Sequence, residues 1–298
     1  MPCIIDSPDH IHVTLTCHRN NREKQAKQWF DAAVRIKKAF NDILWDDSEK
    51  LYRDNETEAG AKLYPQDGNS LALLYGLTQS KEQGVAISKA LVQNWNDIGP
   101  VTPELPDTIS AFISSIEVIA HYVAGQAQTS LDLMRRTWGY MLDSPLMTGT
   151  TLIEGMSANG SLAYRSMRSY NFDSAYTSLS HSWSTGPTQA LSFKAVGLEI
   201  VGWKQWSFRP QPGDLTSLRT GYTSPMGQYE AVVKVESHKG TKGFLLKAKI
   251  TTPRGTRGTI DVPFRCKSVT VNGMSYPARN PVSGGESHKI VARECDSS

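Results

Sequence analysis

The feature of this sequence that most constrains its fold is a change in the spacing of apolar residues near Gly197. Before this point, apolar residues recur every three or four positions, which is typical of helices with one buried side. After it, they alternate with polar residues, which is typical of strands with one buried face. We therefore predict an irregular segment at 1–24, a helical domain at 25–197 and a β domain at 198–298.

The helical domain is expected to contain several helices of similar length, joined by short polar loops. Ser80 is a predicted N-cap, because Glu82 and Gln83 follow at capping distance, and Asp107 or Thr108 is expected to cap a later helix. Successive hairpins of this kind predict a toroid or a bundle, and periodicity alone does not decide between them. The predicted helices include 25–45, 69–77, 80–95, 109–123 and 127–142, and a further helix is expected to begin near Pro187. In the first, we expect a single buried stripe that includes Trp29, Ile36, Phe40, Ile43 and Leu44.

The β domain shows its alternation most clearly at 229–236, 244–251 and 259–264. Gly, Pro and charged residues separate these stretches at the intervals of a β-sandwich. The pair Asn272-Gly273 predicts a tight hairpin turn. We expect an antiparallel β-sandwich.

Composition excludes several classes of protein. The chain has 298 residues, of which 39% are hydrophobic and 20% charged, as in ordinary globular proteins. A net charge of +3 gives no strongly basic face, so we expect no nucleic-acid partner. No apolar run approaches the roughly 20 residues of a membrane span, so we expect no membrane partner. Asp6 and Asp9 interrupt any apolar signal core, so no signal peptide is visible and the compartment stays open.

The four cysteines lack the spacing of a metal site or of a disulfide scaffold. Cys3 with Cys17, and Cys266 with Cys295, could each close a loop in an oxidising compartment. Four free thiols are an equally good interpretation. No phosphate-cradling glycine loop or metal-ligand cluster is present in the sequence, so we predict no cofactor and no metal.

The candidate chemistry lies between the two patterns, at 150–197. Glu154 follows a short apolar run and precedes a glycine, and a carboxylate held at the end of a partly dry element can act as a base on water. His181 and Trp183 lie among serines and threonines, and such side chains can bond to and stack on a sugar. From spacing alone, a lone glutamate is usually solvated, a lone histidine structural and a tryptophan part of a core.

Five stretches, in their order along the chain, resemble the second half of the (α/α)6 barrel of glycoside hydrolase family 78, the α-L-rhamnosidases, especially its fungal branch. They are Gln66-Asp67-Gly68-Asn69-Ser70-Leu71-Ala72, the run Ile109 to Glu117, Trp138-Gly139-Tyr140-Met141-Leu142, Glu154-Gly155, and the run His181 to Thr188. The later runs Phe208 to Leu215 and Thr223 to Gly227 resemble the start of that family's C-terminal sandwich. The order of these motifs is more specific than any one of them.

The resemblance implies a fold, an activity and residue roles. The fold is a partial (α/α)6 toroid of helical hairpins followed by the sandwich, and the activity is hydrolysis of terminal α-L-rhamnosides with inversion. The family's base glutamate matches Glu154 and its sugar-contacting histidine matches His181, whereas Trp183 and Glu117 are candidates without an assigned role. The partner class is therefore carbohydrate. The family is often extracellular.

This sequence departs from the family in one important respect: the segment that carries the general acid has no counterpart here. The chain also offers about half the helices of the barrel. A truncated product, a partner or second copy that completes the barrel, and a catalytically inactive carbohydrate-binding pseudo-enzyme are three interpretations. Half a toroid exposes apolar faces, so we expect the isolated chain to be oligomeric or poorly soluble.

Overall fold

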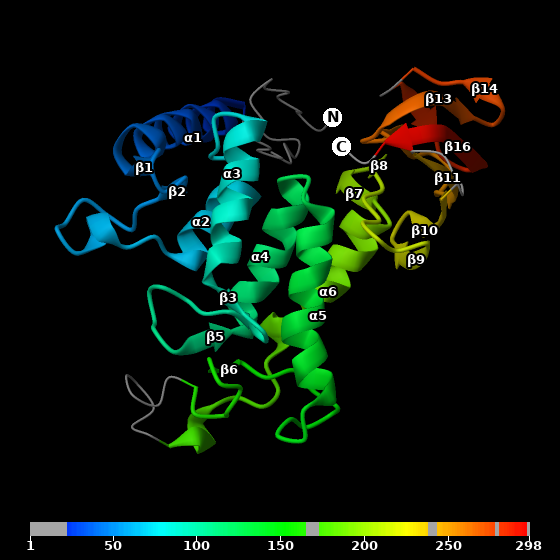
Figure 1. Ribbon diagram of the computed structural model, residues 1–298. Coiled ribbons are helices and arrows are strands. Elements are labelled where there is room, and N and C mark those ends of the chain that lie inside the picture. Colours follow the sequence, from blue (N-terminus) through cyan, green and yellow to red (C-terminus); the bar gives the residue numbers. More distant parts are fainter. Residues whose placement is uncertain (1–22, 165–172, 238–242, 278–279, 297–298) are drawn as a thin grey trace. The chain divides into compact units, whose positions relative to one another are not determined.

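The computed structural model describes residues 23–164, 173–237, 243–277 and 280–296 (Figure 1). The chain divides into two compact units, the first ending at Pro187 and the second beginning at Thr188. We predicted a boundary after Gly197. The residues between these two positions group with the β unit because they contact it: Phe193 lies edge-on to Tyr222, and Lys194 pairs with Glu199.

The first unit is helical, with short strand pairs between its helices. Its helices are α1 (Glu23–Leu44), α2 (Gln66–Leu74), α3 (Lys81–Leu91), α4 (Ala111–Val123) and α5 (Ala127–Asp143). The strand pairs are β1 (Trp45–Asp46) with β2 (Leu51–Tyr52), β3 (Trp95–Asn96) with β4 (Gly99–Pro100), and β5 (Thr108–Ser110) with β6 (Gly155–Ser157). The short helix α6 (Gly186–Gln189) begins in this unit, and a π-helical turn (Ala190–Ala195) follows it.

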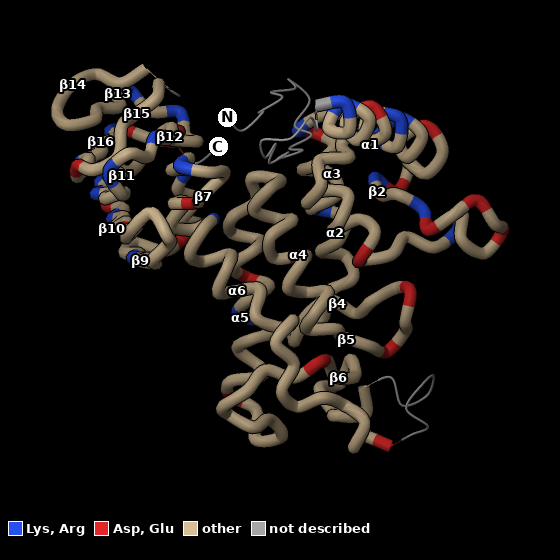
Figure 2. The backbone as a smooth tube through the Cα atoms, turned by 180° about the vertical axis from the view of Figure 1, so that it is seen from behind, with Lys and Arg blue, Asp and Glu red and all other residues tan. Residues whose placement is uncertain are grey.

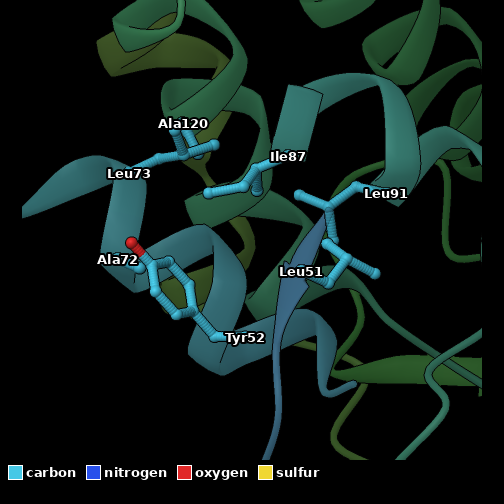
Figure 3. Close-up of a cluster of buried hydrophobic side chains, with 7 residues drawn as sticks. All are labelled: Leu51, Tyr52, Ala72, Leu73, Ile87, Leu91 and Ala120. Atoms are coloured by element: carbon cyan, nitrogen blue, oxygen red, sulfur yellow. The ribbon is translucent and has the colours of Figure 1, made fainter. Parts of the chain in front are cut away.

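Within the described residues there are six α-helices, fewer than a ring of six hairpins would need. Helix α4 contacts both α2 and α5, so it lies between them in this unit (Figure 1). One hydrophobic core joins α2, α3, α4 and β2, and Figure 3 shows its members: Leu51, Tyr52, Ala72, Leu73, Ile87, Leu91 and Ala120. A mixed helical unit with small antiparallel sheets is therefore the observed arrangement.

Of the two N-cap predictions for the helices, one is confirmed and the other is wrong. Ser80 caps α3 as predicted, accepting a hydrogen bond from the Gln83 backbone N–H at 3.1 Å. The predicted cap of α4 at Asp107 or Thr108 was wrong, because Thr108 belongs to β5 and pairs with Ser157 of β6. Ser110 caps α4 instead, accepting from the Ile113 N–H. Pairing between strands distant in sequence shifted the start of this helix.

The single buried stripe predicted for α1 was wrong for three of the five residues named. Phe40 and Leu44 pack against the hydrophobic core, as expected. Trp29, Ile36 and Ile43, which lie seven residues apart, are instead exposed. Seven-residue spacing places these three side chains on one side of the helix, so α1 presents an uncovered apolar stripe.

The second unit is built from two sheets. The larger has the strand order β14-β13-β16-β11-β10-β9 and is antiparallel throughout. The smaller has the order β15-β12-β8-β7, and it contains one parallel pair, β12 with β8, which the antiparallel prediction did not include. The larger sheet comprises β9 (Ser217–Ser224), β10 (Gly227–Ser237), β11 (Phe244–Thr251), β13 (Arg265–Val271), β14 (Met274–Ser275) and β16 (Ser287–Asp296). The smaller comprises β7 (Leu198–Gly202), β8 (Gln205–Phe208), β12 (Arg257–Ile260) and β15 (Pro281–Ser283).

A disulfide links Cys266 of β13 to Cys295 of β16, which are directly opposite each other in the strand register. This pairing decides between two alternatives that the sequence left open for these cysteines. Cys3 and Cys17 lie outside the described residues, as does most of the predicted irregular segment 1–24. None of the described helices is long and apolar enough to cross a membrane.

Asp46 of β1 is the centre of a polar cluster beside the core. Its carboxylate accepts hydrogen bonds from the Ser48 hydroxyl at 2.6 Å, the Tyr64 hydroxyl at 2.7 Å and the Arg53 guanidinium at 2.7 Å. These bonds, with that of Ser48 the largest cause, hold the pKa of Asp46 well below its ordinary value of 3.8. The folded state therefore favours the ionised form of this side chain.

We expect Asp46→Asn to lower the melting temperature at neutral pH and to weaken its dependence on acid. A carboxyl group whose folded pKa is depressed stabilises the protein above its unfolded pKa, and this contribution is lost as the pH falls below that value. Melting curves by circular dichroism at pH 7 and pH 3 measure both effects. Asp97→Asn is the control, because that side chain is fully exposed. Equal pH dependence of the native protein and Asp46→Asn would contradict the assignment.

Candidate functional site

Two segments of the helical unit that carry the predicted site residues lie side by side. The Glu154 N–H donates to the Ser178 carbonyl at 2.9 Å, and the His181 N–H donates to the Leu152 carbonyl at 2.7 Å. The Thr151 hydroxyl also donates to the Leu179 carbonyl. These bonds bring the segment containing Glu154 and the one containing His181 together, as a functional site would require.

The paired segments are anchored to α4 and α5. The Ser184 hydroxyl donates to the Ile153 carbonyl at 2.8 Å, and the Ser184 carbonyl accepts from the Trp138 indole N–H at 2.8 Å. The Gly186 N–H donates to the Ser115 hydroxyl at 3.0 Å. Ile153 and Trp138 are buried, so the candidate side chains stand on a fixed support.

Two glycines of the sequence motifs are explained by close packing. A Cβ on Gly155 would lie 2.7 Å from the Ile109 carbonyl oxygen and still closer to the Tyr164 ring. A Cβ on Gly186 would lie 2.5 Å from the Ser115 Cα. A side chain at either position would push apart the elements that support the site, so both glycines are structural requirements of this arrangement.

Glu154 is half-buried and lies immediately before β6. Its Oε2 accepts a hydrogen bond from the Ser178 backbone N–H at 3.3 Å, which orients the carboxylate. A partly buried, oriented carboxylate has the chemistry of a general base toward water.

His181 and Trp183 meet at the same aromatic side chain. Trp183 is 66% exposed, and its ring lies edge-on to Phe112 of α4 with a centroid separation of 5.1 Å. The half-buried His181 ring is 6.3 Å from the same ring. Phe112 itself is half-buried, although it lies on a helix, and it supports this exposed aromatic surface. Its position inside the family-like run at 109–117 was the signal that could have identified it.

Glu117, the remaining candidate, is fully buried. Its carboxylate accepts hydrogen bonds from the Gln66 amide at 2.5 Å and the Trp95 indole N–H at 2.8 Å, and His121 Nε2 lies 3.2 Å away. The other ring nitrogen of His121 is 2.6 Å from the Ser88 hydroxyl. This serine–histidine–glutamate series superficially resembles a catalytic triad, but all three side chains are buried, so substrate cannot reach it. Glu117 ties α2 and β3 to α4, and His121 extends this network to Ser88 of α3.

A second carboxylate, Glu104, lies at the N-terminus of α2. Its oxygens accept hydrogen bonds from the backbone N–H groups of Gln66 at 2.9 Å and Asp67 at 3.3 Å. Burial raises the pKa of Glu104 above its ordinary value, and the two backbone bonds oppose this shift. Acceptors are favoured at a helix N-terminus because the first N–H groups lack partners within the helix, so Glu104 acts as a cap. In the described ranges, no group of three or more His, Cys, Asp or Glu side chains could hold a metal ion.

Comparison with known proteins gives a family match for part of the second unit. Residues 199–275 match the family model described as the bacterial alpha-L-rhamnosidase C-terminal domain. No match was found among curated proteins.

Solved structures extend the likeness over most of the chain. The native α-L-rhamnosidase from Aspergillus terreus aligns over 92% of this chain with 21% sequence identity and a TM-score of 0.62, and the alignment covers 28% of that protein. The α-L-rhamnosidase from Dictyoglumus thermophilum aligns over 91% with 17% identity and the same TM-score, covering 29% of that protein. The chain thus spans less than a third of either enzyme. The resemblance to a C-terminal portion of the α-L-rhamnosidases, predicted from the motifs, is confirmed.

Proposed function

We propose that this chain, as the counterpart of a rhamnosidase C-terminal portion, acts in the hydrolysis of terminal α-L-rhamnosides with inversion, with Glu154 as the general base. The observation that carries the proposal is the hydrogen-bonded pairing of the Glu154 and His181 segments. By the resemblance of the motifs, these two residues match the family's base and its sugar-contacting histidine. Their segments lie adjacent in space although they are distant in sequence. In this proposal, the helical unit is part of an (α/α)6 toroid.

The proposed chemistry assigns a separate task to each side chain. The Glu154 carboxylate takes a proton from a water molecule, and the water oxygen attacks the anomeric carbon from the face opposite the leaving oxygen. The bond to the leaving oxygen breaks, and that oxygen takes a proton from an acid about 6.5–9.5 Å from the base. His181 bonds to sugar hydroxyls, and Trp183 stacks on the apolar face of the ring.

The general acid is not assigned to any residue of this chain. An acid supplied by a second copy or a partner chain would complete both the site and the ring of helices. The uncovered stripe of Trp29, Ile36 and Ile43 on α1 supports such an association, because contiguous exposed apolar side chains mark interaction surfaces.

The exposed Trp183 ring also favours a second candidate function, binding of carbohydrate without hydrolysis. Sugar stacking needs only the aromatic surface of Trp183 and Phe112, whereas turnover needs the acid as well. The two functions differ in their requirement for a good leaving group.

The test is hydrolysis of nitrophenyl α-L-rhamnoside and of a rhamnose-containing disaccharide by the purified chain. A nitrophenolate leaves with little protonation, so a site with a base and no acid is expected to turn over the aryl substrate and not the disaccharide. Proton NMR of the first product is expected to show the inverted anomer. Turnover of both substrates would place an acid within the chain. Sugar binding without turnover of either would select the second candidate.

A further inference from the structure

The outward face of the six-stranded sheet in the second unit is rich in cations. Along β11 and β16, Ala248 and Ile290 point into the core, while their neighbours Lys249 and Lys289 are exposed. Figure 2 marks Lys and Arg positions along these strands in blue. The exposed cations on this face are Arg219, Lys234, Lys247, Lys249, Lys289 and Arg293.

Two pairs of lysines lie directly opposite each other across neighbouring strands. Lys249 pairs in register with Lys289, and Lys234 pairs with Lys247. Like charges directly opposite each other destabilise a sheet. Lys247 is compensated by Glu236, at 2.8 Å. Lys249, Lys289 and Arg293 form no ion pair with any residue that the structure describes.

The uncompensated cations border an open depression of about 700 Å³. Polar side chains complete its lining: Thr270, Asn272 and Ser287. Lys249, Lys289 and Arg293 thus line a hollow that also carries two hydroxyl groups and the amide of Asn272, whose oxygen accepts from the Lys289 backbone N–H at 2.9 Å. Positive charge concentrated in a hollow raises the local concentration of anions.

We propose that this depression binds an acidic oligosaccharide through the carboxylates of its uronic acid residues. The side chains of Lys249, Lys289 and Arg293 form ion pairs with the carboxylates. The hydroxyl and amide groups form hydrogen bonds with the sugar hydroxyls. An anion between Lys249 and Lys289 would also remove the repulsion between them. The choice of a glycan among polyanions rests on the proposed function. Nucleic acid is disfavoured because none of the described residues that line the depression is aromatic and able to stack on bases, and three cations neutralise few phosphates.

Binding of oligogalacturonate by the full chain, measured by isothermal titration calorimetry, tests the proposal. A neutral galactan fragment of equal length and a single-stranded oligonucleotide of equal charge are the comparison ligands. The variant Lys249→Gln/Lys289→Gln is expected to bind oligogalacturonate at least about tenfold more weakly, because two charge-assisted contacts are lost. Lys249→Arg/Lys289→Arg is expected to retain binding. The melting temperature of the glutamine variant is expected to be unchanged or higher, since the like-charge pair is gone.

Lys27→Gln/Lys38→Gln on α1 is the matched control, because it removes the same charge from exposed positions of the other unit. Weakening by the sheet variant with little change in the control supports the depression as the site. If the sheet variant and the α1 control weaken oligogalacturonate binding equally, the loss of binding reflects only the net charge of the chain, and the proposal is overturned. Equal affinity for the oligonucleotide, or no binding of oligogalacturonate at low salt, would also overturn it. The readout is binding, so it remains valid if the chain hydrolyses no rhamnoside.

Discussion

Glu154→Gln is expected to reduce the kcat for nitrophenyl α-L-rhamnoside by about 10²–10⁴, the range typical of a lost general base. The amide has the size of the carboxylate, and its carbonyl oxygen can still accept the hydrogen bond from the Ser178 N–H. It cannot take a proton from water. The KM is expected to change little, because substrate contacts are assigned to His181 and Trp183. Initial rates over a range of substrate concentrations measure both parameters.

Two controls separate a base from a structural glutamate. Glu230→Gln makes the same chemical change on β10 of the second unit and is expected to retain full activity. Glu154→Ala in the presence of azide is expected to form an inverted rhamnosyl azide, because a small anion can attack where the activated water did. Retention of the native kcat by Glu154→Gln would remove Glu154 from the proposed mechanism.

Sequence patterns correctly predicted strands and a helix cap that depend on interactions between residues close together in the chain. The alternation at 229–236 and 244–251 corresponds to β10 and β11, and Ser80 caps α3. The parallel pairing of β12 with β8 could not be read in this way, because it joins segments that are about fifty residues apart. The start of α4 moved for the same reason, since β5 pairs with the distant β6. Strand pairing and the start of α4 depend on segments that are distant in the sequence. The pattern of neighbouring residues therefore does not predict them.

The candidate site, too, could be predicted from the sequence only in part. Motif order identified Glu154 and His181 as residues of interest, but the sequence does not reveal the hydrogen bonds that join their segments. Phe112 and Glu117 lie on the same helix, within one family-like run. Packing separates their roles, because Phe112 supports the exposed Trp183. Glu117 is instead buried against residues of α2, β3 and α4. Side-chain type alone could not distinguish the buried, structural Glu117 from the proposed general base, Glu154.

Glu117→Ala is expected to lower the free energy of unfolding by at least about 3 kcal/mol, because three buried donors lose their acceptor at roughly 1–3 kcal/mol each. If the Ser88 hydroxyl donates to His121 Nδ1, the Nε2–H of His121 donates to Glu117. The carboxylate then accepts from three donors, those of Gln66, Trp95 and His121. Alanine leaves all three without an acceptor in a region closed to water. Urea denaturation followed by tryptophan fluorescence measures the loss.

Glu117→Gln and Glu58→Ala are the comparison variants for the loss of stability in Glu117→Ala. Glutamine keeps one acceptor oxygen, so its cost is expected to fall to about 1–3 kcal/mol. Glu58 is exposed, and its replacement is expected to change stability by less than about 0.5 kcal/mol. Glu117→Gln that is folded at low temperature is expected to keep the native kcat, because Glu117 contacts no substrate. A stable Glu117→Gln that loses activity as severely as Glu154→Gln would instead make Glu117 part of the chemistry. An unchanged unfolding free energy in Glu117→Ala would show that the buried network contributes little to holding α2, α3 and α4 together.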